Sequence, residues 1–432
     1  MCSVFAKERS AAVLQLAAGA AVTETPSASS SVELKSVKHQ IIEPVRSLSS
    51  YRAAKARTLD VRIRRGRRQR STFAVTCLAW LSFTKPAGAA DQAGSSVLVY
   101  VDSDNATVWK PLGSTEMTWG PATVRAQWST DFISAASVDL VSAASPKGFS
   151  ERRHQADLGA SWDLGDGASL GLVTTVSREP DFRSQSLTLA GSRGWWDRRL
   201  TTAVSIGLAT AATGRVLDDT AWRDRTSQDG QLLVSLVLSP VTVVDTLYNV
   251  ARLDGFQASP YRYVRLFRDA AALHETAIVE NTPTERWRHA WTGRLRHRLR
   301  VDLFGQTDYR LYVDSWGMVA HTASARAVWT LPAEAWTVTL EGRGHRQSGV
   351  AFYQGRYQTL PLAPVWRTAD KELGPMWTAL GGVHLEWSRR LFNLSVVRVG
   401  AGADLLHMRY ADHPYLRERT AVLTTVGIEW QH

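Results

Sequence analysis

The clearest pattern in this chain is an alternation of apolar and polar residues between positions 285 and 348. After Glu334, the apolar side chains of Trp336, Val338 and Leu340 alternate with threonine, Glu341, Arg343 and histidine. A period of two places alternate side chains on opposite faces of a β-strand. The preceding segment alternates in the same way, with Val301, Leu303, Gly305, Tyr309 and Leu311 on one face and Asp302, Gln306, Asp308, Arg310 and Asp314 on the other.

The polar face of these strands carries rows of charge rather than a neutral mixture. Arg288, Arg294, Arg296 and Arg298 share one parity ahead of a short link near Leu299, and aspartates follow on the next strand. Opposite charges on neighbouring strands pair across one face of a sheet. Such a face suits the inside of a wide, wet barrel, whose apolar face would meet lipid, where only helices and closed barrels satisfy the backbone. A two-layer soluble β protein is the alternative.

Strand-like runs are joined alternately by short and long links. The short links fall near 118–121, 164–167, 194–197, 239–240, 299, 331–334 and 389–392. The other links are long at 134–150, 211–226, 254–284 and 347–374, and brief at 179–181, 314–315 and 411–414. Short turns at one end and long loops at the other are typical of bacterial outer-membrane barrels.

The sequence therefore predicts an all-β protein, a closed antiparallel up-and-down transmembrane β-barrel with both termini periplasmic. Counting from Thr107 gives 15 strands, and residues 95–101 supply one more, for a total of about 16. An even number suits single-chain barrels, and 14 is the alternative. No segment after residue 90 approaches 18 consecutive apolar residues, so no transmembrane helix is expected.

Tryptophans gather at the two ends of the expected strands, as amphipathic rings do at the two membrane interfaces. Those beside short turns or the C-terminus are Trp119, Trp162, Trp195, Trp196, Trp329, Trp336, Trp387 and Trp430. Those toward the long loops are Trp287, Trp291, Trp316 and Trp377.

The formal net charge of +11 belongs almost entirely to the front of the chain. Residues 1–89 hold 15 Lys+Arg and 5 Asp+Glu, whereas residues 90–432 hold 36 and 35. A nucleic-acid partner is therefore not expected. Both cysteines, Cys2 and Cys77, also lie in the front segment, which excludes a disulfide framework in the rest of the chain.

Residues 61–89 have the three parts of a secretory signal peptide. A basic stretch at 62–70 precedes an apolar run at 71–83, and small residues follow to Ala89. We expect Sec export, cleavage near Ala89 and a barrel domain over residues 90–432. A membrane anchor is the alternative. Residues 1–60 are interpreted as a mis-assigned start or an unstructured extension.

Several phrases resemble a proteobacterial outer-membrane β-barrel family of unknown function, of the DUF-3570 type. They are Ile133–Ser137, Ser142–Pro146, Arg178–Phe182, Asp254–Val264 and Asp308–Gly317, and the resemblance covers roughly residues 95–432. It implies a secreted outer-membrane barrel. It implies no activity, substrate or catalytic residue.

Two sets of residues are candidates for a site. The lumen charge rows are Arg288, Arg294, Arg296, Arg298, Arg310, Arg326, Arg343, Asp302, Asp308, Glu341 and Glu386. They could guide anions, as charged rings do in pores, or pair with one another and with Asp314. The outer-rim loop residues are Tyr261, Arg262, Tyr263, Arg265 and Arg268. They could contact sugar or phosphate, or fold back onto Asp254 or Asp269.

The sequence favours a porin-like barrel of the Gram-negative outer membrane that passes small solutes. A loop-plugged barrel that binds a surface or a partner is the alternative, and an outer-membrane hydrolase is a third. No catalytic, cofactor-binding or metal-ligating set is predicted, because histidines such as His407 and His413 are scattered and no triad order is evident. Expected partners are membrane lipid, lipopolysaccharide and small solutes, with the barrel-assembly machinery acting on a C-terminal strand that ends at His432 rather than the usual Phe.

Overall fold

The computed structural model describes residues 90–135, 149–215, 218–268, 274–331, 335–358, 364–391 and 395–432. The predicted signal peptide and the segment before it lie outside these residues. The strands up to the middle of the chain are β1 (Ala90–Asp102), β2 (Ala106–Trp119), β3 (Ala122–Ala135), β4 (Phe149–Gly165), β5 (Ala168–Arg178), β6 (Phe182–Trp195), β7 (Leu200–Arg215), β8 (Asp218–Ser239) and β9 (Thr242–Gly255). The remaining elements are β10 (Tyr263–Phe267), β11 (His274–Val279), β12 (Glu285–Arg298), β13 (Leu303–Asp314), β14 (Val319–Thr330), β15 (Trp336–Gln347), β16 (Tyr357–Gln358), the 3-10 helix η1 (Lys371–Leu373), β17 (Met376–Leu391), β18 (Ser395–Tyr410) and β19 (Glu418–Gln431).

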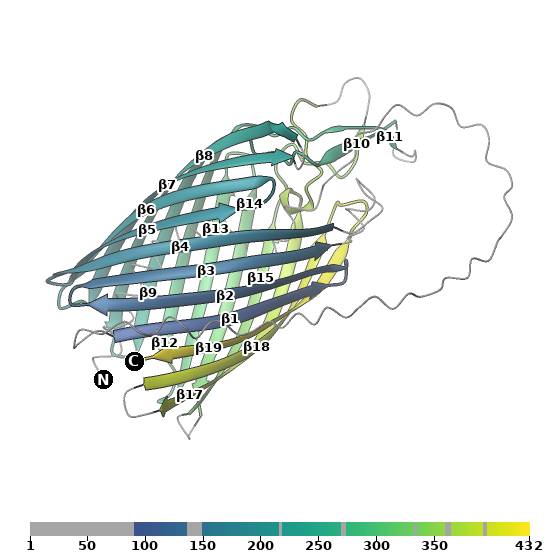
Figure 1. The fold of residues 1–432 in the computed structure, drawn as a ribbon. Helices are drawn as coiled ribbons and strands as arrows, with labels where there is room; N and C mark the ends of the chain where they lie inside the picture. The colour runs from purple at the N-terminus through teal and green to yellow at the C-terminus, as the bar shows by residue number, and fades with distance from the viewer. Residues whose placement is uncertain are drawn as a thin grey trace, which may run out of the picture.

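Sixteen of these described strands close into one antiparallel barrel (Figure 1). Each strand pairs with its neighbour along the chain, and β9 pairs with β12 and β15 with β17 where long links intervene. The last strand pairs with the first from Gln431 opposite Gln92 to Ala421 opposite Asp102. The prediction of a closed barrel of 16 strands is confirmed, and the predicted first strand at 95–101 lies within β1.

The two ends of the barrel differ in the length of their links, as predicted. The turn end carries the links 120–121, 166–167, 196–199, 240–241, 299–302, 331–335 and 392–394. The loop end carries 103–105, 136–148, 179–181, 216–217, 256–284, 315–318, 348–375 and 411–417. The start of β1 and the end of β19 lie together at the turn end, whereas their periplasmic orientation remains a prediction.

One predicted long link is wrong. Residues 211–226 do not form a loop, because β7 continues to Arg215 and β8 begins at Asp218, with Thr213 opposite Arg223. The hairpin extends because Gly214 leaves room for the ring of Trp222, which would collide with any side chain at that position. The guanidinium of Arg183 covers the same ring from β6.

The apolar parity of each strand faces outward. Ile206 on β7 is 59% exposed and Leu340 on β15 is 52% exposed, while Arg343 points to the opposite side of its strand. Large aliphatic residues so exposed are unfavourable in water, but they suit contact with hydrocarbon, where a closed sheet leaves no backbone edge unpaired. The predicted division into an apolar outer face and a charged inner face is confirmed.

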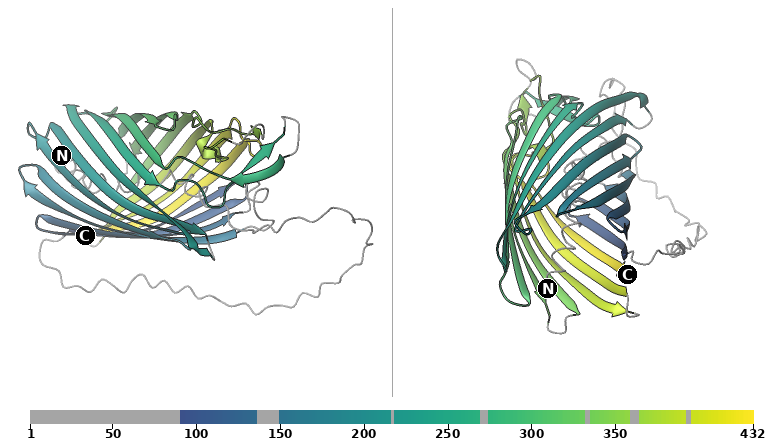
Figure 2. Two further views of the ribbon diagram at one scale, coloured as in Figure 1. Left: turned by 90° about the horizontal axis from the view of Figure 1, so that it is seen from above. Right: turned by 90° about the vertical axis from the view of Figure 1, so that its left-hand side faces the viewer.

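The two longest described links at the loop end meet in a small separate sheet. β10 and β11 form an antiparallel hairpin, and β16, from the link between β15 and β17, adds a parallel strand beside β10. Figure 1 shows β10 and β11 beyond the loop end, and Figure 2 shows the same arrangement from above. We call the links 256–284 and 348–375 together the loop-end cap.

The prediction that Trp316 belongs to a belt of tryptophans at the membrane interface is wrong. Its ring is buried in an apolar cluster with Met318 and Val350, and its indole N–H donates to the Glu285 carbonyl at 2.9 Å. It therefore packs the base of the loop-end cap instead of facing lipid. Among the described residues, no helix is long and apolar enough to cross a membrane.

Candidate functional site: the charged lumen wall and the loop-end cap

The inner face of β12–β15 carries most of the predicted arginine row. Register places the charges so that they meet across neighbouring strands: Arg294 is opposite Asp308, and Arg326 is opposite Glu341. Arg294 pairs with Asp308, and the Arg326 guanidinium lies 2.6 Å from Glu341. Because each pair spans two strands, this wall is cross-linked by charge-assisted hydrogen bonds.

Asp308 is saturated by its neighbours. Besides Arg294, its carboxylate accepts hydrogen bonds from the Gln306 amide at 2.8 Å and the Ser324 hydroxyl at 3.3 Å. Arg296 finds its partner on the other side, 2.9 Å from the buried carboxylate of Asp245 on β9. Three of the predicted arginines are thus neutralised within the wall.

The other predicted arginines have different surroundings. Arg298 donates to the carbonyls of Arg300 and Val301 and so braces the link at the turn end. Arg288 lines a small cavity with Arg310. In the described part of the chain, neither Arg310 nor Arg343 makes an ion pair with a carboxylate.

Two predicted acidic residues do not join the arginine row. Asp302 lies in the link at the turn end, where it accepts a hydrogen bond from the outward-facing Trp329 at 3.0 Å, so its placement in the lumen is wrong. The cause is that β13 begins only at Leu303, which leaves Asp302 outside the alternation. Glu386 lines the lumen on β17, without an arginine partner among the described residues.

The wall formed by β17, β18, β19 and β1 is hollowed near the turn end. A cavity of about 380 Å³ is lined by the glycines Gly94, Gly400, Gly402 and Gly427 together with serines and threonines of β1, β2 and β15. The wall recedes there because glycine has no side chain. Two side-chain pairs lie beside the hollow, the hydrogen-bonded His384 and Asp404 at 3.0 Å and the ion pair of Arg398 with Glu429.

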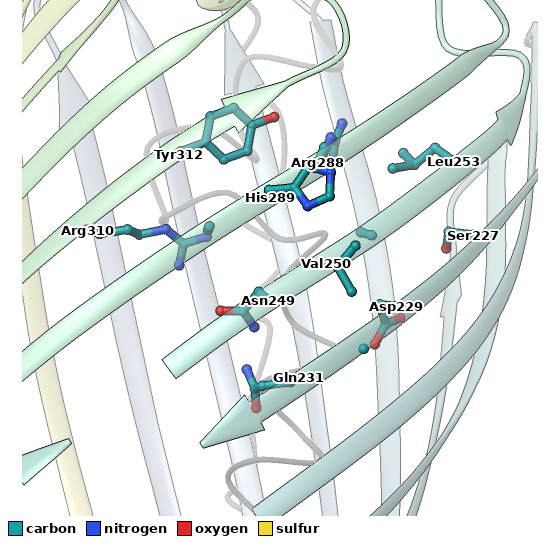
Figure 3. A pocket seen from close by; sticks show the side chains of 13 residues that line it. Ser227, Asp229, Gln231, Asn249, Val250, Leu253, Arg288, His289, Arg310 and Tyr312 are labelled. Carbon is teal, nitrogen blue, oxygen red and sulfur yellow. The ribbon is translucent and has the colours of Figure 1, made fainter. Parts of the chain in front are cut away.

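A second cavity, of about 110 Å³, lies on the wall of β8, β9, β12 and β13. Its polar lining includes Asp229, Gln231, Asn249, Arg288 and Arg310. Figure 3 shows these side chains on successive strands around one space, with Tyr312 beside them. This cavity adjoins Arg310, which makes no ion pair with a carboxylate among the described residues.

The predicted rim residues belong to the loop-end cap. Arg262 lies 2.5 Å from Asp370 and 3.7 Å from Glu280, so it joins the two long links. Of the two alternative partners, Asp269 lies outside the described residues. Glu280 also accepts a hydrogen bond from the Ser259 backbone at 2.7 Å. Burial raises the pKa of the Glu280 carboxyl, against the lowering effect of the Arg262 charge.

The remaining rim residues differ in their burial and in their contacts. Tyr261 is buried, Tyr263 is half-buried at the start of β10, and Arg268 is exposed. The Arg265 guanidinium stacks on the ring of Tyr415 at 4.2 Å, which ties the cap to the link between β18 and β19. The five residues therefore do not form one surface.

Two of the phrases that carry the family resemblance shape the base of the cap. Gly255 has φ +118°, and a side chain there would collide with the Asp224 carbonyl, so only glycine allows the chain to leave β9 at this angle. Asp314 accepts hydrogen bonds from Arg286, Tyr312 and the backbone N–H groups of Trp316 and Met318. It thereby fixes the link between β13 and β14.

Several charged residues of the lumen escaped the sequence reasoning. Asp245, Arg286, Arg398 and Asp404 each pair across strands. The alternation along β12 could have revealed Arg286, which lies two positions before Arg288 and so on the same face. The others required the register of strands that are neighbours only in the closed barrel.

The described residues contain no group of three or more His, Cys, Asp or Glu side chains that could hold a metal ion. His384 and Asp404 form a pair, but no serine or threonine hydroxyl is hydrogen-bonded to that histidine among the described contacts. The arrangement supplies charge, hydroxyl groups and space, which are the means of binding or passing a solute.

These features define a transmembrane β-barrel of the outer-membrane type, with an apolar exterior and a charged lumen. Residues 212–401 match the model of the family described as "Protein of unknown function (DUF3570)". The match and the barrel fit an outer-membrane barrel family of unknown function, as the resemblance predicted. The matched region includes the phrases Asp254–Val264 and Asp308–Gly317. No curated protein matches the chain.

Solved barrels are similar at low identity. The siderophore receptor PirA from Pseudomonas aeruginosa has a TM-score of 0.40 and 12% identity, over 79% of this chain and 62% of that one. CdiB from Acinetobacter baumannii gives 0.46 and 9%, over 78% and 60%. A bacterial polysaccharide outer membrane secretin gives 0.43 and 10%, over 78% and 97%. This chain spans less than two thirds of the first two, and the likenesses are too distant to bear on function.

Proposed function

We propose that this protein is a passive pore of the Gram-negative outer membrane for small polar solutes. The observation that carries the proposal is the lumen of the closed 16-strand barrel, whose walls present charged pairs, hydroxyl groups and a hollow of about 380 Å³. Barrels of this size leave an aqueous interior. The charges on the walls keep a passing polar solute hydrated or hydrogen-bonded.

Bilayer conductance tests the proposal directly. The full chain, refolded in detergent and added to a planar bilayer, should give discrete current steps in potassium chloride. Complete absence of steps from protein that has refolded would remove the pore. Refolding is checked by gel migration, because a closed barrel resists unfolding and moves anomalously until it is boiled.

A loop-plugged interaction protein is the second candidate, and the loop-end cap favours it. Arg262, Glu280 and Asp370 join the two long links through buried charges. The cap also exposes the large apolar side chains of Val365 and Trp366, which is typical of contact surfaces.

Loosening the cap separates the two candidates. Replacing Arg262 by Gln leaves Glu280 and Asp370 buried without this cation and should weaken the contact between the two links, which the pairing of β10 with β16 still joins. If the native protein is silent in bilayers and Arg262→Gln gives current steps, the cap plugs the barrel. If both conduct equally, the cap does not close the lumen.

The cellular setting follows from the same proposal. The apolar exterior suits the outer membrane, which the chain would reach after Sec export and signal cleavage near Ala89. Lipid and lipopolysaccharide would then surround the barrel, and the barrel-assembly machinery would insert it. Membrane fractionation, with N-terminal sequencing of the mature protein, tests both parts. Recovery without detergent, or a mature chain that begins elsewhere, would contradict them.

A further inference from the structure

Six of the arginines facing the lumen on β12–β15 fall into two groups by their partners. Arg286, Arg294, Arg296 and Arg326 each meet a carboxylate, on Asp314, Asp308, Asp245 and Glu341 respectively. Arg310 and Arg343 meet none among the described residues. A guanidinium left in a protein wall without an anion keeps its full charge and its donors available for one.

Arg310 and Arg343 lie close to one another. β14 lies between them and contributes two hydroxyl residues, with Thr322 opposite Arg310 and Ser324 opposite Arg343. The two guanidinium charges act on each other, and both act on His345. Like charges gathered in this way repel, and an anion that binds between them relieves the repulsion.

The nearest carboxylates are already engaged. Asp308, two residues before Arg310, accepts from Arg294, Gln306 and Ser324. Glu341, two residues before Arg343, accepts two hydrogen bonds from Arg326. Neither is therefore available to neutralise the two arginines.

The cavity of about 110 Å³ beside Arg310 supplies further polar groups. Gln231 is only 8% exposed, and among the described residues neither its amide oxygen nor that of Asn249 has a hydrogen-bond partner. A buried amide oxygen without a partner is unfavourable, and the NH₂ groups of the two amides are hydrogen-bond donors. Asp229 also lines the cavity, against Arg288 and Arg310, so the lining has more positive than negative groups.

We propose that Arg310 and Arg343, on either side of β14, form a binding subsite for the oxyanion group of a small solute, a carboxylate or a phosphate. The cavity with Asn249 and Gln231 borders this subsite on the side of Arg310. Guanidinium groups and amide N–H groups are the donors that bind such oxygens in pairs. The proposal refines the pore described above and depends on it for its role in transport. Binding itself can be measured separately.

Calorimetry of the full-length protein refolded in detergent measures binding. Sodium phosphate is one probe and sodium acetate the other, so that the two sources of an oxyanion are distinguished. The variants are Arg310→Gln, Arg343→Gln and their combination, with Arg343→Lys to keep the charge. The control removes a neutral pair from the far wall, Arg398→Gln with Glu429→Gln. Boiled and unboiled gel migration confirms that each variant has folded.

We expect at least one probe to bind, each Gln substitution to weaken binding about tenfold, as loss of a charge-assisted hydrogen bond does, and Arg343→Lys to restore part of it. The control should bind as the native protein does. In bilayers, the same probe should reduce the chloride current of the native protein and leave that of the double variant unchanged.

The outcomes separate the subsite from the pore. If neither probe binds, or if the double variant binds as tightly as the native protein, the subsite is wrong even where the barrel conducts. If the barrel gives no current steps but the probe binds and the double variant loses it, the pore is wrong and the subsite stands.

Discussion

The wall of β5–β7 and the wall of β12–β15 belong to one barrel but divide polar and apolar residues differently. On β5–β7 the outside is aliphatic, with Leu172, Leu187 and Ile206 exposed, and the inside is neutral, with the hydroxyls of Thr188 and Ser205. On β12–β15 the outside mixes aromatic residues such as Trp291 and Tyr309 with aliphatic and small ones, and the inside carries arginines and carboxylates. Both walls present an outer face that can contact lipid, but only the wall of β12–β15 places charged side chains in the lumen.

The difference shows how charge can be placed in a barrel at little cost. Where each arginine has a carboxylate one strand away, as Arg294 has Asp308, the pair strengthens the wall and adds little net charge. Where the carboxylates are already taken, as beside Arg310 and Arg343, positive charge remains in the lumen. The function of the charged wall thus depends on which few residues are left over, and not on the length of the arginine row.

The largest expected effect comes from breaking the buried pair at the loop end of the charged wall. The side chains of Arg286 and Asp314 are 7% and 0% exposed, so Asp314→Ala leaves Arg286 buried without its anion. The substitution also removes the acceptor of two backbone N–H groups, those of Trp316 and Met318. Breaking such a pair costs about 3–5 kcal/mol. Urea titration followed by tryptophan fluorescence, in vesicles, measures the free energy of unfolding.

The control for this prediction is Asp302→Ala, which removes a partly exposed aspartate at the turn end that accepts one indole N–H and lies 3.6 Å from Arg300. Its effect should be much smaller. Equal losses in the two variants would show that the buried pair does not stabilise the charged wall more than an exposed contact does.

A smaller effect is expected from placing charge on the lipid face of the neutral wall. Ile206→Arg puts a guanidinium near the middle of β7, and this should destabilise the barrel by about 2–4 kcal/mol. Leu238→Arg, at the turn end of β8, has the same chemistry near the membrane interface and should cost about 0–1 kcal/mol. The same titration measures both. If the two variants lose equal stability, Ile206 does not face the hydrocarbon core.

The alternation along the chain was sufficient to predict the barrel, its strand number and its two faces, because side-chain parity in a strand is set locally. It was not sufficient to pair the charges. Asp245 meets Arg296 only because β9 lies beside β12 across a link of 29 residues, 256–284. The hairpin at Gly214 and Trp222 was also missed, since polar residues there suggested a loop.

The rim residues illustrate the same limit. Arg262 was interpreted either as a contact for anions or as an arginine that folds back onto a nearby aspartate. The structure pairs it with Glu280 and Asp370, the latter 108 residues away. A local sequence pattern cannot predict a contact over that sequence separation, because the pairing depends on two long links that meet at the loop end.

The smallest expected effect comes from an exposed pair within the charged wall. The side chains of Arg326 and Glu341 are 46% and 23% exposed, so water screens their attraction, and Arg326→Gln should cost only about 0–1 kcal/mol. Its effect on ions should have the same sign as that of Arg310→Gln, since each substitution removes one positive charge from the lumen. Arg326→Gln leaves the negative charge of Glu341 unpaired in the lumen and should shift the reversal potential in a salt gradient toward cations, and Glu341→Gln should shift it toward anions. Arg326→Gln combined with Glu341→Gln should restore the native value, since the pair is neutral. A combined variant that matched either single variant would mean that only one member of the pair acts on passing ions, and the pair would then not be neutral toward them.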